Sequence, residues 1–167
     1  MQMKNAVATS LVFALLTTTA IAADKYKQVG SEAGWDIYIR EGKARGCLLA
    51  KDLAGDTQFQ MGINPAEQVK GFMALYTKAG ADISAGDKVS VLFDVDGQKF
   101  TGQAVGQQME GYKGAYVQVN NPDFIYDLAK KKTLTIIPEG REPIKLSLTG
   151  TDAAFKALRM CQEAATQ

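Results

Sequence analysis

The stretch KVSVLFDVDGQKF, residues 88–100, indicates the fold most directly. Its apolar residues recur at every second position, which is the pattern of a half-buried β-strand: Val89, Val91, Phe93 and Val95. Asp96-Gly97 follows at once, and this dipeptide favours the two-residue turn of a β-hairpin. The stretch therefore predicts two antiparallel strands joined at residues 96–97.

The same alternation continues on both sides of this hairpin. Strands are predicted wherever it recurs, around residues 35–39, 47–49, 58–63, 112–119, 133–136 and 144–148. Segment 70–78 (KGFMALYTK) is apolar on both faces, which predicts a central strand or one covered by another element. Turn residues separate these patterns about every 8–12 positions, as in antiparallel all-β folds. We expect a mainly β protein, an antiparallel sandwich or barrel of eight to nine strands.

Two short helices are predicted within this pattern. Asn121-Pro122 favours a helix start near 122–131, because Asn caps helices and Pro suits the first helical position. The lysines at 130–132 then fall at the helix end, where positive charge favours the helix dipole. A second helix is predicted near 152–163, with apolar residues on one face at helical spacing: Ala154, Phe155, Leu158 and Cys161.

The N-terminal segment has the layout of a secretory signal peptide. Residues 1–22 read MQMKNAVATSLVFALLTTTAIA, with Lys4 ahead of an apolar run and small residues at the end. We expect cleavage after Ala22 or Ala23 and a single β-sandwich domain over residues 23–167, periplasmic or secreted. A bilayer-spanning helix needs about 20 apolar residues. No other run is apolar enough, so we expect no membrane insertion of the mature chain.

The composition narrows the classes of function. The chain has 19 Lys and Arg against 18 Asp and Glu, and Lys4 lies in the predicted signal, so the mature part balances at 18 to 18. A neutral chain makes no electrostatic case for binding nucleic acid. The absence of histidine removes the commonest general base and the commonest zinc ligand. We recognise no catalytic, metal-binding or cofactor motif and predict a protein that is not an enzyme.

The two cysteines of the chain are predicted to lie on the same core. Cys47 is on the inward face of an early strand, and Cys161 is on the inward face of the last helix. A disulfide between them would join that helix to the sheet, and an exported protein meets the oxidising conditions that such a bond requires. Two free core thiols and a redox-active pair are the alternatives.

Three tyrosines are candidates for binding a partner. In QQMEGYKGAYVQV, residues 107–119, Ala115, Val117 and Val119 would face the core, and Tyr112 and Tyr116 would face outward. Tyr38 would lie on the outward face of its own strand. Exposed tyrosines on a sheet are good contact residues. They bind a protein or glycan, or they simply cover the outer face of the sheet.

The C-terminal part of the chain resembles a known family. The sequence NPDFIYDLAKKKTLTIIPEGREPIKLSLTGTDAAFKALRMC lies within residues 120–161 and is similar to the end of the invasion associated locus B family of bacterial exported proteins. The G-W-D-I-Y motif at 34–38 resembles the start of that family. The resemblance implies a β-sandwich in the periplasm or at the cell envelope of a Gram-negative bacterium. It carries over no catalytic residue.

These observations predict an exported protein that binds a protein or an envelope component. A small-ligand carrier or an enzyme inhibitor is the alternative, with its pocket between the sheets or under the last helix, and a deep apolar cavity would favour it. A carboxylate-based hydrolase is the third alternative, and it would need two carboxyl groups in one cleft.

Overall fold

Ten antiparallel strands lie side by side in one sheet in the computed structural model, which describes residues 25–42, 46–63, 70–78, 80–109 and 111–165. Their spatial order is β1-β2-β3-β4-β5-β8-β7-β6-β9-β10, so β1 and β10 are the edges and the sheet is not closed. The strands are β1 (Lys25–Glu32), β2 (Trp35–Glu41), β3 (Cys47–Leu53), β4 (Thr57–Ile63), β5 (Gly71–Thr77), β6 (Lys88–Val95), β7 (Gln98–Met109), β8 (Tyr112–Val119), β9 (Thr133–Pro138) and β10 (Ile144–Ser147). The helices are α1 (Pro122–Asp127), a 3-10 turn over Leu128–Lys130 and α2 (Thr151–Ala165).

The predicted mainly β, antiparallel fold is confirmed, with one strand more than the eight or nine expected. The additional strand is β1, which pairs with β2 alone at the edge of the sheet. From Tyr26 to Glu32 its side chains are exposed except at the half-buried Gly30. A strand with no buried face shows no apolar alternation, and this is why the pattern in the sequence did not reveal it.

The hairpin predicted over residues 88–100 is present as β6 and β7, with Val95 paired to Gln98 across the turn. Asp96 and Gly97 both have positive φ angles, 51° and 87°, as a tight turn of this type requires. The carboxylate of Asp96 accepts hydrogen bonds of 2.9 Å from the backbone N–H groups of Lys132 and Thr133. These bonds hold the pKa of Asp96 below its usual value and tie the turn to the start of β9.

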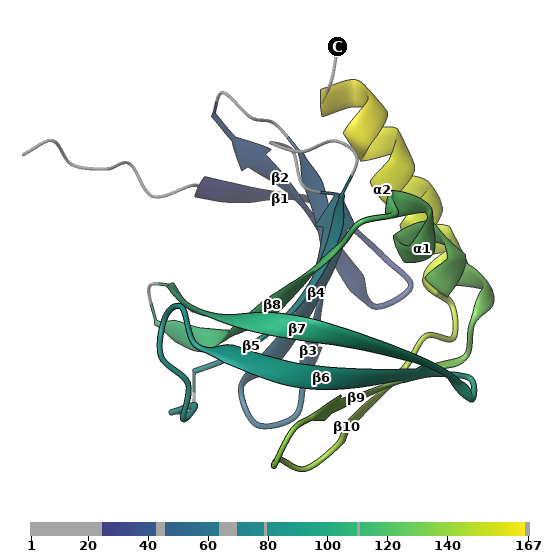
Figure 1. The fold of residues 1–167 in the computed structure, drawn as a ribbon. Coiled ribbons are helices and arrows are strands. Elements are labelled where there is room, and N and C mark those ends of the chain that lie inside the picture. Colours follow the sequence, from purple (N-terminus) through teal and green to yellow (C-terminus); the bar gives the residue numbers. More distant parts are fainter. Residues whose placement is uncertain (1–24, 43–45, 64–69, 79, 110, 166–167) are drawn as a thin grey trace, which may run out of the picture.

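The sheet is strongly bent, and both helices lie against the same side of it (Figure 1). Helix α2 packs on β2 and β3, while α1 packs on β4 and β5. One hydrophobic core lies between the helices and the sheet. Its large, fully buried side chains include Trp35, Leu49, Phe59, Met61, Ile125, Leu134 and Leu158. Segment 70–78 supplies β5, which lies between β4 and β8 as a central strand, as predicted.

The two predicted helices are also confirmed. At α1, the side chain of Asn121 accepts a 3.0 Å hydrogen bond from the backbone N–H of Asp123, as a helix cap does. At α2, Ala154, Phe155 and Leu158 are buried on the face turned to the sheet. None of the helices in the described part of the chain is long and apolar enough to cross a membrane.

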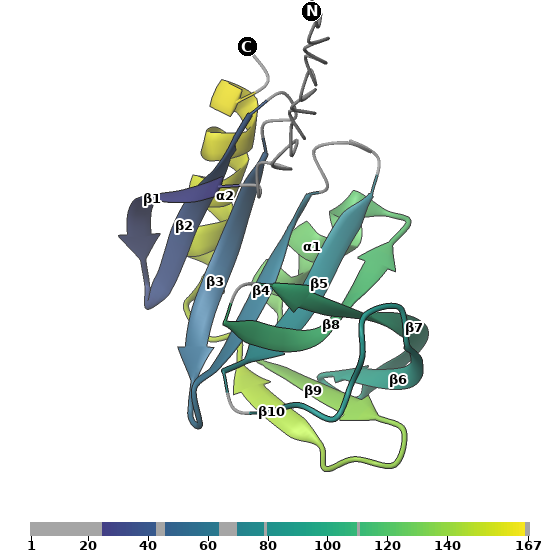
Figure 2. The ribbon, with the colours of Figure 1, turned by 90° about the vertical axis from the view of Figure 1, so that its left-hand side faces the viewer.

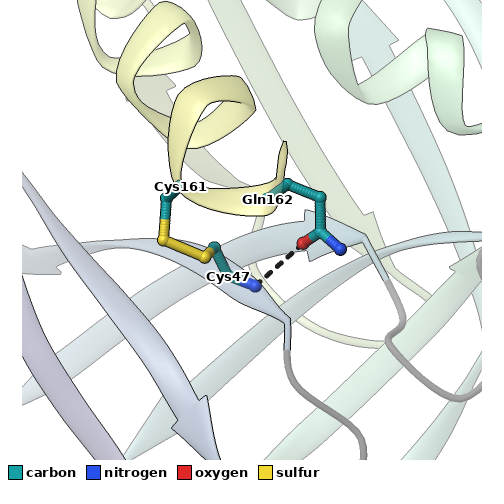
Figure 3. The surroundings of a disulfide bond; sticks show 3 residues. All are labelled: Cys47, Cys161 and Gln162. Atoms are coloured by element: carbon teal, nitrogen blue, oxygen red, sulfur yellow. Dashed lines mark hydrogen bonds between the residues drawn. A yellow bond between two sulfur atoms is a disulfide. The ribbon is translucent and has the colours of Figure 1, made fainter. Parts of the chain in front are cut away.

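The disulfide predicted between Cys47 and Cys161 is present, with 6.0 Å between the Cα atoms (Figure 3). It joins the first residue of β3 to the penultimate turn of α2 and closes a loop of 114 residues. Beside it, the backbone N–H of Cys47 donates a 2.9 Å hydrogen bond to Oε1 of Gln162. The strand and the helix are thus connected by one covalent bond and one hydrogen bond at the same point. The predicted signal peptide and its cleavage site lie outside the described residues.

Two glycines allow the backbones around the bend to approach closely. At Gly114 of β8, a Cβ atom would overlap the carbonyl oxygen of Leu75 in β5. At Gly106 of β7, a Cβ atom would overlap the carbonyl oxygen of Ser84, in the connection between β5 and β6. Glycine is therefore required at both positions, because no other residue leaves this space empty.

Candidate functional site

A cavity of about 530 Å³ lies in the bend of the sheet. We call it the apolar cavity. Every strand from β3 to β10 contributes to its lining, whereas none of the described lining residues belongs to a helix. Its inner wall consists of buried core side chains: Phe59, Met73, Val91, Phe93, Val117 and Ile136. The small side chains of Ala104 and Ala115 also line it and leave its centre open.

Three connections of the sheet contribute to the lining of the apolar cavity, and we call this part of the lining its mouth. The β3–β4 turn contributes Ala54, the β5–β6 connection contributes Ile83, and the β9–β10 turn contributes Arg141. The β5–β6 connection is held in place by backbone hydrogen bonds between Gly86 and Gly106, and between Gly106 and Asp87. The Arg141 guanidinium donates a hydrogen bond to the carbonyl oxygen of Asp82, so the β9–β10 turn is joined to the same connection.

A second, smaller hollow lies on the opposite face of the sheet, the face that Figure 2 shows with the helices behind it. We call it the tyrosine hollow. It measures about 200 Å³, and six residues from β1, β2, β3, β4 and β8 line it: Tyr26, Tyr38, Leu48, Gln58, Gln60 and Tyr112. β1 and the β7–β8 hairpin project on either side of this face (Figures 1 and 2). The hollow is thus walled by tyrosines from one edge of the sheet, in β1 and β2, and from its middle, in β8.

Hydrogen bonds orient the amide groups at the floor of the tyrosine hollow. Nε2 of Gln60 donates to Oε1 of Gln58 at 2.7 Å, and Nε2 of Gln58 donates to Oδ1 of Asp52 at 2.9 Å. Burial raises the pKa of Tyr38 above its usual value, and the negative charges of Asp36 and Asp52 add to this effect. At neutral pH the Tyr38 phenol is therefore a hydrogen-bond donor, and the glutamines present acceptors and donors in fixed orientations.

The structure brings together two of the three candidate tyrosines. Tyr38 and Tyr112 line the same hollow, while Tyr116 lies on the same face in register with Ala74 and is not among the described lining residues. The alternation in β8 is as predicted, because Ala115, Val117 and Val119 pack on the core. Sequence reasoning missed Tyr26, whose strand was not recognised. Gln58 and Gln60 could have been identified from the sequence, since the alternation at 58–63 already placed them on the outward face of the sheet.

Sequence reasoning also missed where a cavity would form. We expected a ligand pocket, if present, between two sheets or under the last helix. The apolar cavity lies instead within a single bent sheet, away from both helices.

Acidic groups do not converge in either cavity. No Asp or Glu is among the described residues that line the apolar cavity or the tyrosine hollow. Within the described ranges, no cluster of three or more His, Cys, Asp or Glu side chains is arranged to hold a metal ion.

A scan against protein-family models and searches of curated proteins and of solved structures found no match.

Proposed function

We propose that this protein is an exported, non-enzymatic carrier that holds a small apolar ligand in the apolar cavity. The observation that supports this proposal is the cavity itself, about 530 Å³ in volume and walled by core side chains. Protein interiors are packed as densely as organic crystals and leave few voids larger than a water molecule. Pockets that bind small molecules measure about 300–1,000 Å³ and are mostly apolar. The apolar cavity has the size and chemistry of such a pocket.

Export is part of this proposal and is supported by two observations. The first 22 residues follow the three-part pattern of a signal peptide. The disulfide between Cys47 and Cys161 is of the kind that persists outside the reducing cytosol. Membership of the invasion associated locus B family stays a prediction that rests on the resemblance over residues 120–161.

Fluorescence of the neutral dye N-phenyl-1-naphthylamine tests the carrier function. We expect the purified protein to bind the dye saturably, with the emission increase that an apolar environment produces. The double variant Ala104→Leu/Ala115→Leu fills the cavity and should weaken binding by roughly tenfold or more, because the dye needs the lost volume. Ala164→Leu is the matched control, since Ala164 is exposed on α2 and does not line the cavity.

Two results would contradict the carrier function. One is the absence of saturable binding by the folded wild-type protein. The other is equal binding by the wild type and the filled variant, which would place the dye outside the apolar cavity. Near-ultraviolet circular dichroism of each variant establishes that it is folded.

The tyrosine hollow supports a second candidate function, which is binding of an envelope glycan. Tyrosine rings stack on the faces of sugar rings, and oriented amides bond to their hydroxyl groups. The specific observation is the convergence of Tyr38 and Tyr112 with Gln58 and Gln60 around one hollow. Both this function and the carrier function can reside in one molecule, because the two cavities lie on opposite faces of the sheet.

Titration with N-acetylglucosamine oligosaccharides tests the glycan function by calorimetry. We expect the affinity to fall for Tyr38→Ala and Tyr112→Ala and to be unchanged for Lys99→Ala, a variant in β7 outside the hollow. No binding by the wild type, or equal binding by all variants, would contradict the glycan function.

A protein partner at the same face would instead be found by photo-crosslinking from position 112 in the periplasm.

A further inference from the structure

The described charged residues that line the apolar cavity are all cationic. Three cationic residues are among its lining: Lys113, Arg141 and Lys145. All three are exposed, so their charges lie toward solvent while the inner wall stays apolar. Five acidic residues lie in the flanking connections, but no described acidic residue lines the cavity: Asp56, Asp82, Asp87, Glu139 and Glu142. The chain as a whole is close to neutral, and the excess positive charge is therefore a local property of this cavity.

The three cations come from parts of the chain that meet only in the folded protein. Lys113 is near the start of β8 on the same face as Ala115 and Val117, which pack on the core. Arg141 is in the β9–β10 turn, and Lys145 is in the edge strand β10. The hydrogen bond from Arg141 to the carbonyl oxygen of Asp82 occupies one donor of its guanidinium. A guanidinium has five N–H donors in all, so others are left for an anion.

We propose that the ligand of the apolar cavity is an anionic amphiphile with a single acyl chain, a fatty acid. Its hydrocarbon chain fills the apolar cavity, and its carboxylate lies at the mouth beside Lys113, Arg141 and Lys145. This inference rests on the carrier function proposed above and adds the chemical class of the ligand. Its basis is charge complementarity: an apolar chamber whose charged lining residues are all cationic matches a molecule that is apolar with one negative end.

The two parts of such a ligand contribute differently to binding. Each methylene group that leaves water for the cavity tightens binding roughly fourfold, until the chain fills the space. The carboxylate meets cations that are partly hydrated, so its contribution is smaller and sensitive to salt. We expect dodecanoate to bind roughly tenfold more tightly than dodecanol at low salt, which corresponds to ordinary exposed ion pairs. In about 1 M salt the Debye length falls to about 3 Å and the difference should largely vanish.

Displacement of N-phenyl-1-naphthylamine by three ligands of equal chain length tests the inference. Dodecanoate, dodecanol and dodecylamine differ only in whether the head group is negative, neutral or positive at neutral pH. We expect affinity to fall in that order. Lys113→Met/Lys145→Met keeps the apolar stems and leaves Arg141 as the remaining cation of the described lining, so it should reduce the preference for dodecanoate over dodecanol. Lys99→Met/Lys156→Met removes the same charge from positions outside the cavity and should leave the preference intact.

The outcomes separate this inference from the carrier function. Equal affinity for the three ligands, or a preference that is unchanged in Lys113→Met/Lys145→Met, would overturn the assignment of a fatty acid while the carrier function stands. Failure of all three ligands to displace a dye that does bind would also overturn it. If neither the dye nor any amphiphile binds the folded protein, the carrier function fails as well.

Discussion

Removing the disulfide should cost this protein a large part of its stability. The variant is Cys47→Ala/Cys161→Ala, which leaves no thiol and no buried polar atom in place of the bond. For the loop of 114 residues that the bond closes, the chain-entropy relation gives about 5 kcal/mol at 25 °C. Domains of this size unfold with free energies of about 5–15 kcal/mol. The bond therefore contributes between a third and all of the net stability, if the entropy relation holds.

Urea denaturation followed by circular dichroism measures this contribution. Urea lowers the free energy of unfolding of small proteins by about 1–3 kcal/mol per molar. The midpoint of the variant should accordingly lie roughly 2–5 M below that of the oxidised wild type. Wild-type protein reduced and alkylated in urea is the control, and its midpoint should agree with that of the variant.

A midpoint shift under about 0.5 M would refute this reasoning, provided that intact-mass measurement finds the bond in the wild type. It would mean that the unfolded chain gains little freedom when the bond is removed, either because it stays compact or because α2 remains locally attached. Hydrogen exchange distinguishes the two cases. If the bond matters as calculated, the amides of α2 should exchange faster in the variant than those of β5.

Four further substitutions probe the fold. Gly114→Ala should destabilise the protein by about 3 kcal/mol in urea titrations, because the new methyl group overlaps the β5 backbone. Gly34→Ala is the control: its methyl group meets open space, so it should cost only about 1–2 kcal/mol of left-handed backbone strain. Trp35→Phe should cost less than the roughly 3–5 kcal/mol of a Trp→Ala change, since Nε1 of Trp35 has no hydrogen-bond partner among the described residues. The pKa of Asp96 is lowered in the folded protein, so its stabilising effect is complete above about pH 4 and is lost as the pH falls through the folded pKa. Asp96→Asn should remove that part of the acid dependence in thermal melts between pH 2 and 7.

The elements that were predicted correctly depend on interactions close in sequence. The hairpin of β6 and β7 needs only alternation and a turn, and both are visible within residues 88–100. The pairing of Cys47 with Cys161 spans 114 residues, but each cysteine had its own local pattern that placed it inward. With only two cysteines in the chain, two inward positions were enough to predict the bond.

The features that were missed depend on the order and curvature of the strands. β8 pairs with β5 although β6 and β7 lie between them in sequence, and only this pairing brings Tyr112 across the face toward Tyr38. The alternation of inward and outward residues along each strand indicated which face its tyrosines lie on. It did not indicate which strands are neighbours in the sheet. The apolar cavity depends on how far the sheet bends, and close backbone approaches such as those at Gly106 and Gly114 are not visible in a sequence where glycines also fit ordinary turns.

The position of the disulfide also sets the order in which the protein can mature. A protein chain is synthesised from its N-terminus, so Cys47 leaves the ribosome long before Cys161. At about 5–20 residues per second, the 114 residues between them take roughly 6–23 s to be synthesised. During that time the eight strands from β3 to β10 are synthesised, while the first thiol has no partner within its own chain. Ring closure is therefore a late event, and an incomplete chain that ends before α2 keeps a single reactive thiol by which a cell can recognise it.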